Sequence, residues 1–340
     1  MISSIVFILV LSVHQCDSYP YLASKLQPDI FHPFQEPGPN DIRGPCPGLN
    51  AAANHGFISR SGITTLAELV QMQQDLYNVG LDLAIVLATV GVALDGDILT
   101  GKLSIGKESS AVPGLLRTPG GLNAHNKFEG DTSLTRNDYY LADGDNFRFN
   151  GTLYGMMYAE AQKNNGLYSW KAMADYPLLL YGAATFLYEL FPNGTDKLPT
   201  EKVISSFFGA KQTGNGKWAA TPERIPSNWY KRETPYTLVD VAVEILKLYL
   251  EHIALFGGNT GRPNSFILNP LQLTLDKQTV NGILCFLYQT ILSVVPSQIE
   301  TLVTTPLAIL NYLTANLDPI FGPQFGCPST SLDQIVAKKQ

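Results

Sequence analysis

The sequence predicts a mainly α-helical protein with a few short strands, and three observations lead to this expectation. Hydrophobic residues make up 45% of the 340 residues and charged residues only 15%, which suits a large apolar core. Apolar residues recur with helical spacing through most of the chain. Strand-like alternation is confined to short pieces at 98–105 and 265–275. We expect a single domain over residues 19–340, with its core at about 41–330.

The helices follow from apolar spacing and from their start signals. Thr65 and Glu68 form a capping-box pattern, which predicts a helix that runs to about residue 79. A second apolar helix is expected at 81–94, and 101–121 is typical of a loop because it is rich in proline and glycine. The remaining helices are expected at residues 131–142, 152–164, 175–190, 201–208, 236–255, 277–293 and 298–315.

The first 18 residues are typical of a cleavable secretory signal. An apolar run at residues 5–13 is followed by small residues on the N-terminal side of a cut before Tyr19. A membrane anchor is the alternative, but the run is too short to cross a bilayer. We therefore expect a secreted, extracellular protein. Glycosylation sequons at Asn150 and Asn193 agree with that location.

Charge and hydropathy exclude two classes of partner. The formal net charge is −6 and the chain has no run of lysine and arginine, which argues against a nucleic-acid partner. The later apolar stretch at 81–94 is interrupted by Asp82 and Gly91, as in a core helix, so we expect no stable membrane span. The sequence carries no signal for the oligomeric state.

The number of cysteines is the first clue to function. Removal of the signal removes Cys16 and leaves Cys46, Cys285 and Cys327. In an oxidising compartment two of three cysteines normally pair. Cys285 and Cys327 both lie in the C-terminal region and close a loop of moderate length, so we predict a disulfide between them. Cys46 is then an odd thiol, for which metal ligation, intermolecular pairing, nucleophilic chemistry and inert burial are the alternatives.

The residues around Cys46 favour a ligand. Prolines on both sides restrict the backbone, and Pro47 suits the first position of a helix that Cys46 would cap. The positive end of the helix dipole favours thiolate over thiol, and a thiolate suits the axial position of haem iron. A cysteine hydrolase is disfavoured because no histidine and asparagine motifs accompany the cysteine. By itself, the local motif fits a buried structural cysteine almost as well.

A second motif lies at residues 128–138. A carboxylate, a backbone carbonyl and a hydroxyl fall within five residues, at Glu129, Gly130 and Ser133. Oxygen ligands at this spacing suit Mg²⁺, with an anionic group of a cofactor completing the shell. An ordinary helix-capping segment is the alternative, and for this motif alone it is the better one.

Taken together, the motifs resemble the chloroperoxidase-like haem-thiolate family. They are Arg-Gly-Pro-Cys-Pro-Gly-Leu-Asn at 43–50, Asn-His-Gly at 54–56, Gly-Gly-Leu-Asn at 120–123 and Phe-Glu-Gly-Asp-Thr-Ser-Leu-Thr-Arg-Asn-Asp at 128–138. The pattern is most similar to the long fungal unspecific peroxygenases and is dense over residues 41–150. The resemblance implies the chloroperoxidase-like helical fold, with haem b and Mg²⁺ as cofactors.

The resemblance also implies roles for single residues. Cys46 would be the axial thiolate, and Glu129, the carbonyl of Gly130 and Ser133 would bind Mg²⁺ beside a haem propionate. Phe128 and Phe186 would line the substrate channel. The long relatives have a C-terminal disulfide at the positions of Cys285 and Cys327 and a sequon at the position of Asn150. His55 and His125 lie inside matched motifs, where a structural hydrogen-bonding role is expected. Arg43 would contact a haem propionate or form a surface ion pair.

The resemblance fails at the distal acid–base position. Long peroxygenases carry a glutamate in a Tyr-Gly-Glu-x-x-Phe helix, with an arginine two turns earlier. Here residues 181–186 are Tyr-Gly-Ala-Ala-Thr-Phe, so Ala183 replaces the carboxylate, and Tyr176 occupies the position of the arginine. The distal histidine of shorter relatives is also absent, because Gly130 occupies that place. Peroxide activation needs a group that moves a proton between the two oxygens.

Several explanations of Ala183 stay open. Another carboxylate could supply the proton, and Glu189, Asp175 and Glu160 are the candidates, although Glu189 lies on the wrong side of the predicted helix. Water alone could serve at a much lower rate. We expect a secreted haem-thiolate peroxidase or peroxygenase that uses hydrogen peroxide to oxidise or oxygenate small apolar or aromatic organic molecules. The alternative is a haem-binding relative with weak or no peroxygenase activity.

Overall fold

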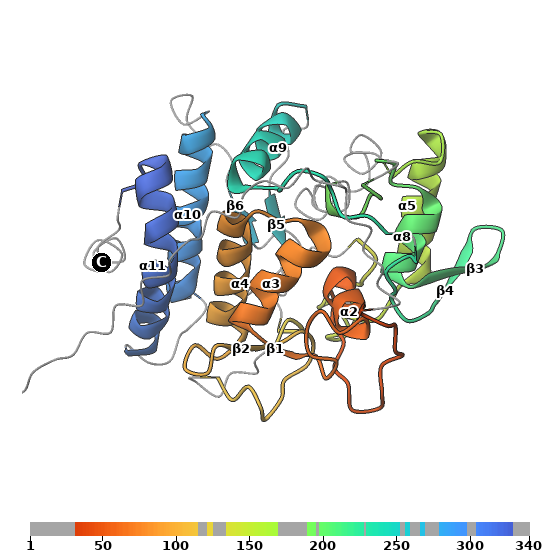
Figure 1. Ribbon diagram of the computed structural model, residues 1–340, viewed down its shortest axis with the longest axis horizontal. Helices are drawn as coiled ribbons and strands as arrows, with labels where there is room; N and C mark the ends of the chain where they lie inside the picture. The colour runs from red at the N-terminus through yellow and green to blue at the C-terminus, as the bar shows by residue number, and fades with distance from the viewer. Residues whose placement is uncertain are drawn as a thin grey trace, which may run out of the picture.

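The computed structural model describes most of the chain from residue 31 onward. The described residues are 31–114, 121–124, 134–168, 189–194, 197–227, 229–251, 256–258, 266–268, 279–297 and 304–328. They are mainly helical, with short two-stranded sheets, which confirms the predicted fold class (Figure 1). Buried residues from Ala51 to Cys327 form one hydrophobic cluster.

The N-terminal part places a short helix beside a helical pair. Helix α2 (Pro47–Asn54) is followed by strand β1 (Ile63–Thr65), helix α3 (Leu66–Tyr77) and helix α4 (Leu81–Asp95). The predicted capping box starts α3: the hydroxyl of Thr65 accepts the amide of Glu68 at 3.2 Å, and the carboxylate of Glu68 accepts the amide of Thr65 at 2.8 Å. The helix therefore begins where the sequence predicts.

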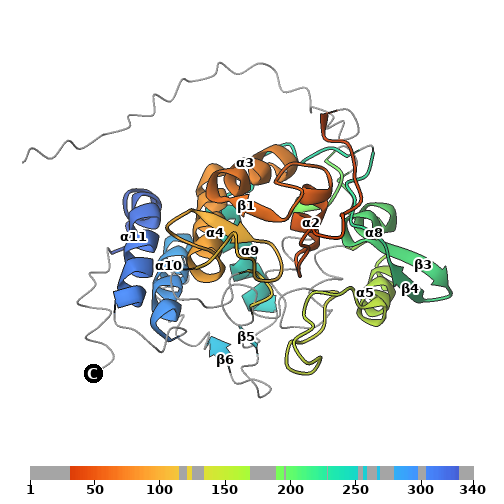
Figure 2. The same cartoon turned by 90° about the horizontal axis from the view of Figure 1, so that it is seen from below.

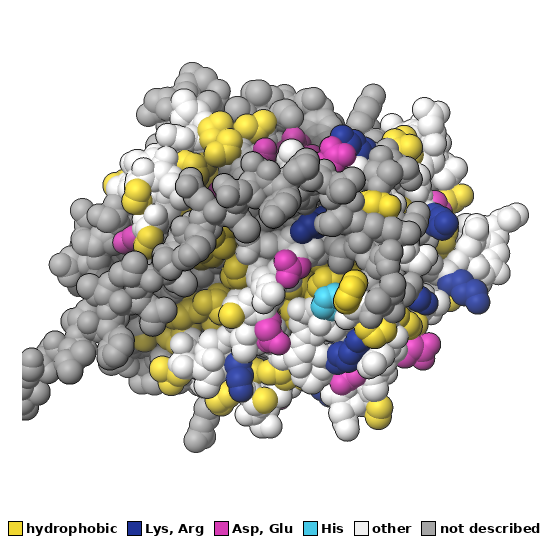
Figure 3. Space-filling view, in the orientation of Figure 1, with side chains coloured by type: hydrophobic (Ala, Val, Ile, Leu, Met, Phe, Trp, Pro, Cys, Tyr) yellow, Lys and Arg dark blue, Asp and Glu magenta, His cyan; other side chains and the backbone are white. Residues whose placement is uncertain are grey.

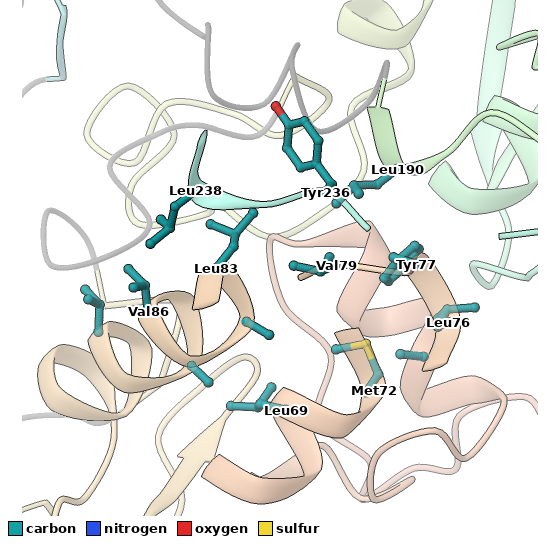
Figure 4. Packing of buried hydrophobic residues seen from close by; sticks show 14 of the residues in the cluster. Leu69, Met72, Leu76, Tyr77, Val79, Leu83, Val86, Leu190, Tyr236 and Leu238 are labelled. Atoms are coloured by element: carbon teal, nitrogen blue, oxygen red, sulfur yellow. The ribbon is translucent and has the colours of Figure 1, made fainter. Parts of the chain in front are cut away.

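Helix α4 is the centre of the packing. Its side chains are buried on several sides because α3, helix α11 (Thr304–Phe325) and strand β2 (Lys102–Ser104) all contact it. Figure 4 shows Leu69 of α3 between that helix and α4, and Leu238 beside Leu83 at the start of α4. Tyr236 lies close by, next to Leu190. Strand β2 pairs antiparallel with β1, and Ile105 and Gly106, which follow β2, lie against Gly44 in the loop that precedes α2.

The other end of the molecule carries a hairpin on a helix. Helix α5 (Gly151–Lys163) packs against strand β4 (Lys217–Ala220), which pairs with β3 (Ala210–Gly214) just after helix α8 (Glu201–Phe208). Figure 2 shows these elements on the side opposite to α10 and α11. The hairpin is absent from our sequence expectation, although the Asn-Gly pair at 215–216 is a turn signal between the two strands.

The C-terminal part is a set of packed helices. Helix α9 (Leu238–Glu251), the pair β5 (Phe256–Gly258) and β6 (Phe266–Leu268), and helix α10 (Val280–Ser297) precede α11. The predicted disulfide between Cys285 and Cys327 is present. It joins α10 to the residues just after α11.

Two helix predictions were wrong in part. Residues 134–142, the described part of the helix expected at 131–142, form turns. The helix expected at 298–315 is α11, which continues to Phe325 through Pro319 and Pro323. Proline normally marks a helix end, but Phe321 and its apolar neighbours are buried against the core, and this packing carries the helix further.

Within the ranges described above, no helix has both the length and the apolar composition needed to cross a membrane. The predicted signal at 1–18 and most of the helix expected at 175–190 lie outside the described residues.

The disulfide generates a prediction about stability. Replacing Cys285 and Cys327 together by serine should lower the free energy of unfolding by about 2–5 kcal/mol, because the unfolded chain loses a crosslink. The two cysteines are 42 residues apart in sequence. Urea unfolding at constant pH measures the change. Wild type unfolded with a thiol reductant is the control and should match the variant, whereas a variant as stable as the oxidised wild type would contradict the prediction.

Candidate functional site

Cys46 stands at the start of α2, as the sequence predicts. It is the N-cap residue, with extended backbone, and Pro47 is the first residue of the helix. Among the described cysteines it is the free one, and it is partly accessible to solvent. The amide of Asn50 donates to the carbonyl of Cys46 at 3.1 Å, which closes the first turn. The thiol is thus held at the positive end of a helix and remains open to a ligand.

The loop before Cys46 is held by the side chain of Asn50. Its Oδ1 accepts the amide of Gly44 at 2.9 Å, and its Nδ2 donates to the carbonyl of Gly44 at 2.9 Å. Gly44 itself is required by close approach, since a Cβ atom there would lie 1.7 Å from the carbonyl oxygen of Ile105. The path of the chain into Cys46 is therefore set by Asn50 on one side and by the residues after β2 on the other.

A buried ion pair lies beside this loop. Nη2 of Arg136 is 2.8 Å from Oε1 of Glu223, and the two side chains are 2% and 12% exposed. The same oxygen of Glu223 accepts a hydrogen bond from Nδ2 of Asn50 at 2.9 Å. Because Asn50 also binds Gly44, the pair is connected to the cysteine loop through one side chain. Breaking a buried pair by removing one partner leaves an uncompensated charge, so the two residues act together.

The C-terminal end of α2 binds the same segment around Glu223. Nδ2 of Asn54 donates to the carbonyl of Glu223 at 2.8 Å, and Nε2 of His55 accepts the amide of Ile225 at 3.1 Å. His55 is fully buried, which confirms its structural role. Arg43 donates from Nε to Oδ1 of Asn54 at 2.8 Å and from Nη1 to two backbone carbonyls. Asn54 and His55 thus fix the C-terminal end of α2 to residues 223–225.

The electrostatic environment of Cys46 combines opposing contributions. Burial raises the pKa of the thiol, and the backbone amides of Leu49 and Gly48 lower it. Arg136 lowers the pKa further, whereas the negative charge of Glu223 raises it. The net direction is upward, so the thiol is protonated near neutral pH until a cation stabilises the thiolate.

Aromatic rings pack under the first turn of α2. The hydroxyl of Tyr77 donates to the carbonyl of Gly48 at 2.9 Å, and a Cβ atom on Gly48 would lie 3.2 Å from the ring of Phe191. Burial raises the pKa of Tyr77 well above its ordinary value, and the charge of Cys46 adds to this. The rings of Tyr77 and Phe191 form an apolar wall that keeps water from the inner side of α2.

These residues suit a site in which Cys46 is the ligand to the iron of a bulky cofactor. The donor is a soft, unpaired thiol that is partly accessible and is influenced by the charge of the buried Arg136. Nε of Arg136 is buried and makes no hydrogen bond within the described part of the chain, so it can meet an anionic group from outside the protein. Haem supplies both an iron for the thiolate and carboxylates for such a donor.

Other predicted site residues are not placed. Glu129, Gly130 and Ser133 of the expected Mg²⁺ site lie outside the described residues. So do the channel residues Phe128 and Phe186, and also His125, Asp175 and Ala183. Within the described ranges no group of three His, Cys, Asp or Glu residues is arranged to hold a metal ion.

Two carboxylates considered as substitutes for the missing glutamate are engaged elsewhere. Glu189 forms an ion pair with Arg232, with both side chains largely buried. Glu160 lies 2.5 Å from the ammonium of Lys163, one turn along helix α5. Both carboxylates therefore have a cation as partner in this arrangement.

Comparison with known proteins decides the family. Residues 32–179 match the family described as Peroxidase, family 2. The chain is 32% identical to the dothistromin biosynthesis peroxidase of Dothistroma septosporum, over 88% of this chain and 81% of that protein. The chain belongs to the chloroperoxidase family. It is also 31% identical to an aromatic peroxidase of Fusarium equiseti, over 79% of this chain and 72% of that protein. An aromatic peroxygenase of Cyclocybe aegerita is 28% identical over 90% and 83% of the two chains.

Membership of the chloroperoxidase family confirms the resemblance inferred from the motifs and supports haem as the cofactor. The peroxidase or peroxygenase class of oxidoreductase follows from the same relatives. In this chain Asn50 connects the loop of Cys46 to the ion pair of Arg136 and Glu223.

The two sequon asparagines differ in accessibility. Asn150 is half-buried and caps α5, accepting the amide of Thr152 at 2.8 Å, while its Nδ2 donates to Asn137 at 2.5 Å. Asn193 is 3% exposed. A glycan on Asn193 would therefore have to be attached before the chain folds, and both sites stay predictions.

Sequence reasoning missed the part played by Glu223. No local motif marks this residue, and it lies 87 positions from Arg136. Arg136 and Asn50 were both inside recognised motifs, but no role was assigned to them. Their place in those motifs was the one available signal. Their contacts with Glu223 exist only after folding, so the sequence does not show them.

The opposing charges at Cys46 generate a prediction about pH. In the protein without haem, alkylation of Cys46 should rise with a midpoint above that of an ordinary cysteine, about 8.5, because burial raises its pKa. Glu223→Gln should lower the midpoint and Arg136→Gln should raise it. Iodoacetamide labelling across a pH series, read at the Cys46 peptide by mass spectrometry, measures all three. Shifts of both variants in the same direction would be inconsistent with this account.

Proposed function

We propose that this protein is a secreted haem-thiolate enzyme that uses hydrogen peroxide to oxidise or oxygenate small apolar or aromatic organic molecules. The observation that carries the proposal is the free thiol of Cys46 at the N-terminus of α2, where the charge of the buried Arg136 acts on it. Relatives named aromatic peroxidase and aromatic peroxygenase support the substrate class.

Each residue of the site contributes to one part of this chemistry. Haem b bound through a cysteine thiolate supplies an iron centre whose ligand favours cleavage of the O–O bond of peroxide. Cys46 provides the thiolate, and Asn50 holds the loop that aims it. Arg136 places positive charge near the thiolate, and Glu223 limits the effect of that charge. Tyr77 and the rings around it exclude water from the inner side of α2.

Ala183 motivates a second candidate function. A general acid–base group contributes about 10²–10⁴-fold to rate, and the family position for that group holds alanine. Glu189 and Glu160 are paired with Arg232 and Lys163, which leaves neither as an evident replacement. The second candidate is a haem-binding relative with weak or no peroxygenase activity.

Secretion and magnesium are parts of the proposal that rest on the sequence. Residues 1–18 supply the expected signal, and the disulfide between Cys285 and Cys327 suits an oxidising compartment. Glu129, Gly130 and Ser133 would hold Mg²⁺ beside a haem propionate, as the resemblance implies.

Spectroscopy tests the ligand. The ferrous–CO complex of the protein should have a strongly red-shifted Soret band, because thiolate is a strong electron donor, and Cys46→Ala should abolish the shift. The double variant without Cys285 and Cys327 is the control and should keep it. An unshifted band in the wild type would overturn the assignment of Cys46.

Kinetics test the role of position 183. We expect Ala183→Glu to raise the rate of peroxide-dependent oxidation of a small aromatic substrate by up to about 10²–10⁴-fold, because it restores a proton carrier. Ala184→Glu, at the neighbouring position, is the control and should not raise the rate. If the wild type is already fast and Ala183→Glu changes nothing, another group carries the proton and the expectation is wrong.

A further inference from the structure

A half-buried carboxylate, that of Glu201, binds two buried tyrosines outside the cysteine loop. Tyr154 of α5 and Tyr168 are fully buried, and both hydroxyls donate to the carboxylate of Glu201, at the start of α8. The hydroxyl of Tyr154 is 3.3 Å from Oε1 of Glu201, and that of Tyr168 contacts Oε2 more closely. Burial raises the pKa of Glu201 and of both tyrosines. The proposed function above makes no use of this cluster.

The cluster has the composition of a redox-active tyrosine site. Loss of an electron makes a tyrosine hydroxyl very acidic, so oxidation is easiest where a base accepts its proton. Glu201 is such a base for Tyr154, since it is a carboxylate within hydrogen-bond distance. A half-buried carboxylate beside two tyrosine hydroxyls is a suitable acceptor for the proton that an oxidised tyrosine loses.

Aromatic rings connect the wall beneath Cys46 to Tyr154. Tyr77 lies against the first turn of α2, and its ring centre is 5.7 Å from that of Phe191. Phe191 is 6.0 Å from Phe208, and Phe208 is 6.2 Å from Tyr154. Every step is within the range of ordinary ring contacts, so the packing between the two sites is continuous.

A second and shorter series of contacts reaches the same tyrosine. Arg136, whose charge acts on Cys46, lies 5.9 Å from the ring centre of Phe149. The ring of Phe149 is 5.7 Å from that of Tyr154. Two independent series therefore converge on Tyr154, and dense packing of this kind favours electron tunnelling over paths through water or loops.

From Tyr154 the contacts continue to the surface. The ring of Trp218 on β4 is 4.7 Å from that of Tyr154, and Tyr158 is 5.1 Å from Trp218. Trp218 and Tyr158 are both half-buried. The hairpin of β3 and β4 carries two lysines and no acidic residue. Figure 3 shows most basic side chains of this face on the half that carries α8 and the hairpin.

We propose that Tyr154, Glu201 and Trp218 form an electron route by which donors too large to reach the haem are oxidised at the hairpin surface. The donors would be bulky anionic aromatics, such as phenolates, because the hairpin is positively charged. This inference rests on the proposed peroxidase function, which supplies the oxidant.

The electrons and protons balance through the cluster. Hydrogen peroxide takes up two electrons and two protons and becomes two water molecules. Each electron leaves Tyr154, whose hydroxyl proton passes to the carboxylate of Glu201, and a tyrosyl radical remains. Trp218 then returns an electron to Tyr154, which recovers its proton from Glu201, and Trp218 takes one electron from the donor. One hydrogen peroxide, two phenolates and two protons from solvent thus give two phenoxyl radicals and two water molecules, and Tyr154, Glu201 and Trp218 return to their starting states.

Radical spectroscopy tests the inner part of the route. The haem-loaded protein is mixed with hydrogen peroxide without a donor and frozen for electron paramagnetic resonance. We expect a tyrosyl radical that Tyr154→Phe abolishes and Trp218→Phe retains. The matched control is Tyr288→Phe, since Tyr288 is also a buried tyrosine bound to a carboxylate, that of Asp318, but it lies on α10. That control should leave the signal unchanged.

Donor size tests the outer part of the route. A sulfonated phenol attached to a soluble polymer is compared with the same phenol free in solution. Tyr154→Phe and Trp218→Phe should each lose oxidation of the polymer-bound donor and keep oxidation of the free phenol. Tyr288→Phe should keep both activities. Circular dichroism and the melting temperature show whether each variant is folded.

The outcomes separate this inference from the proposed function. A wild type with the thiolate spectrum and small-donor turnover, but with the same radical signal in Tyr154→Phe, would overturn the electron route alone. Undiminished oxidation of the polymer-bound donor in Trp218→Phe would overturn the exit at the hairpin. Absence of the thiolate spectrum in the wild type would instead overturn the haem assignment.

Discussion

The side chain of Asn50 holds the arrangement on which the rest of the site depends. It binds both backbone groups of Gly44 and the carboxylate of Glu223, and it is nearly fully buried. A buried amide with all these partners satisfied is rigid, because any movement leaves polar groups without partners in an apolar environment. The cysteine loop, α2 and the segment around Glu223 are consequently one unit, although they are far apart in sequence.

The residues around Cys46 match the motifs of the family, whereas the family position of the proton carrier does not. At Cys46, the helix N-terminus and the charge of Arg136 favour the thiolate, whereas burial favours the thiol. On the distal side, the family position for the proton carrier holds Ala183. Under the proposed function, such a protein would keep the residue that binds haem iron. The rate of its reaction with peroxide would then depend on the group that takes over the role of the missing glutamate.

The elements that were predicted well from sequence carry local signals. The capping box at Thr65 starts α3 where expected, and α8 has the predicted bounds of 201–208. Local signals failed where packing competes with them. Turns replace a helix at 134–142, and α11 passes two prolines because Phe321 and its neighbours are buried against the core. The hairpin at 210–220 was missed because its strands are mostly exposed and so lack a buried apolar face. The Asn-Gly pair in its turn was the available signal.

By itself the sequence determined the family, the free thiol at a helix N-terminus and the partner of Cys285. Each depends on residues close together in the chain or on a simple count of cysteines. Only the tertiary structure decided that Glu223 pairs with Arg136 and that Tyr154 lies between Glu201 and Trp218. Such contacts join residues tens of positions apart. Their partners are selected by the packing of whole helices, which no local pattern records.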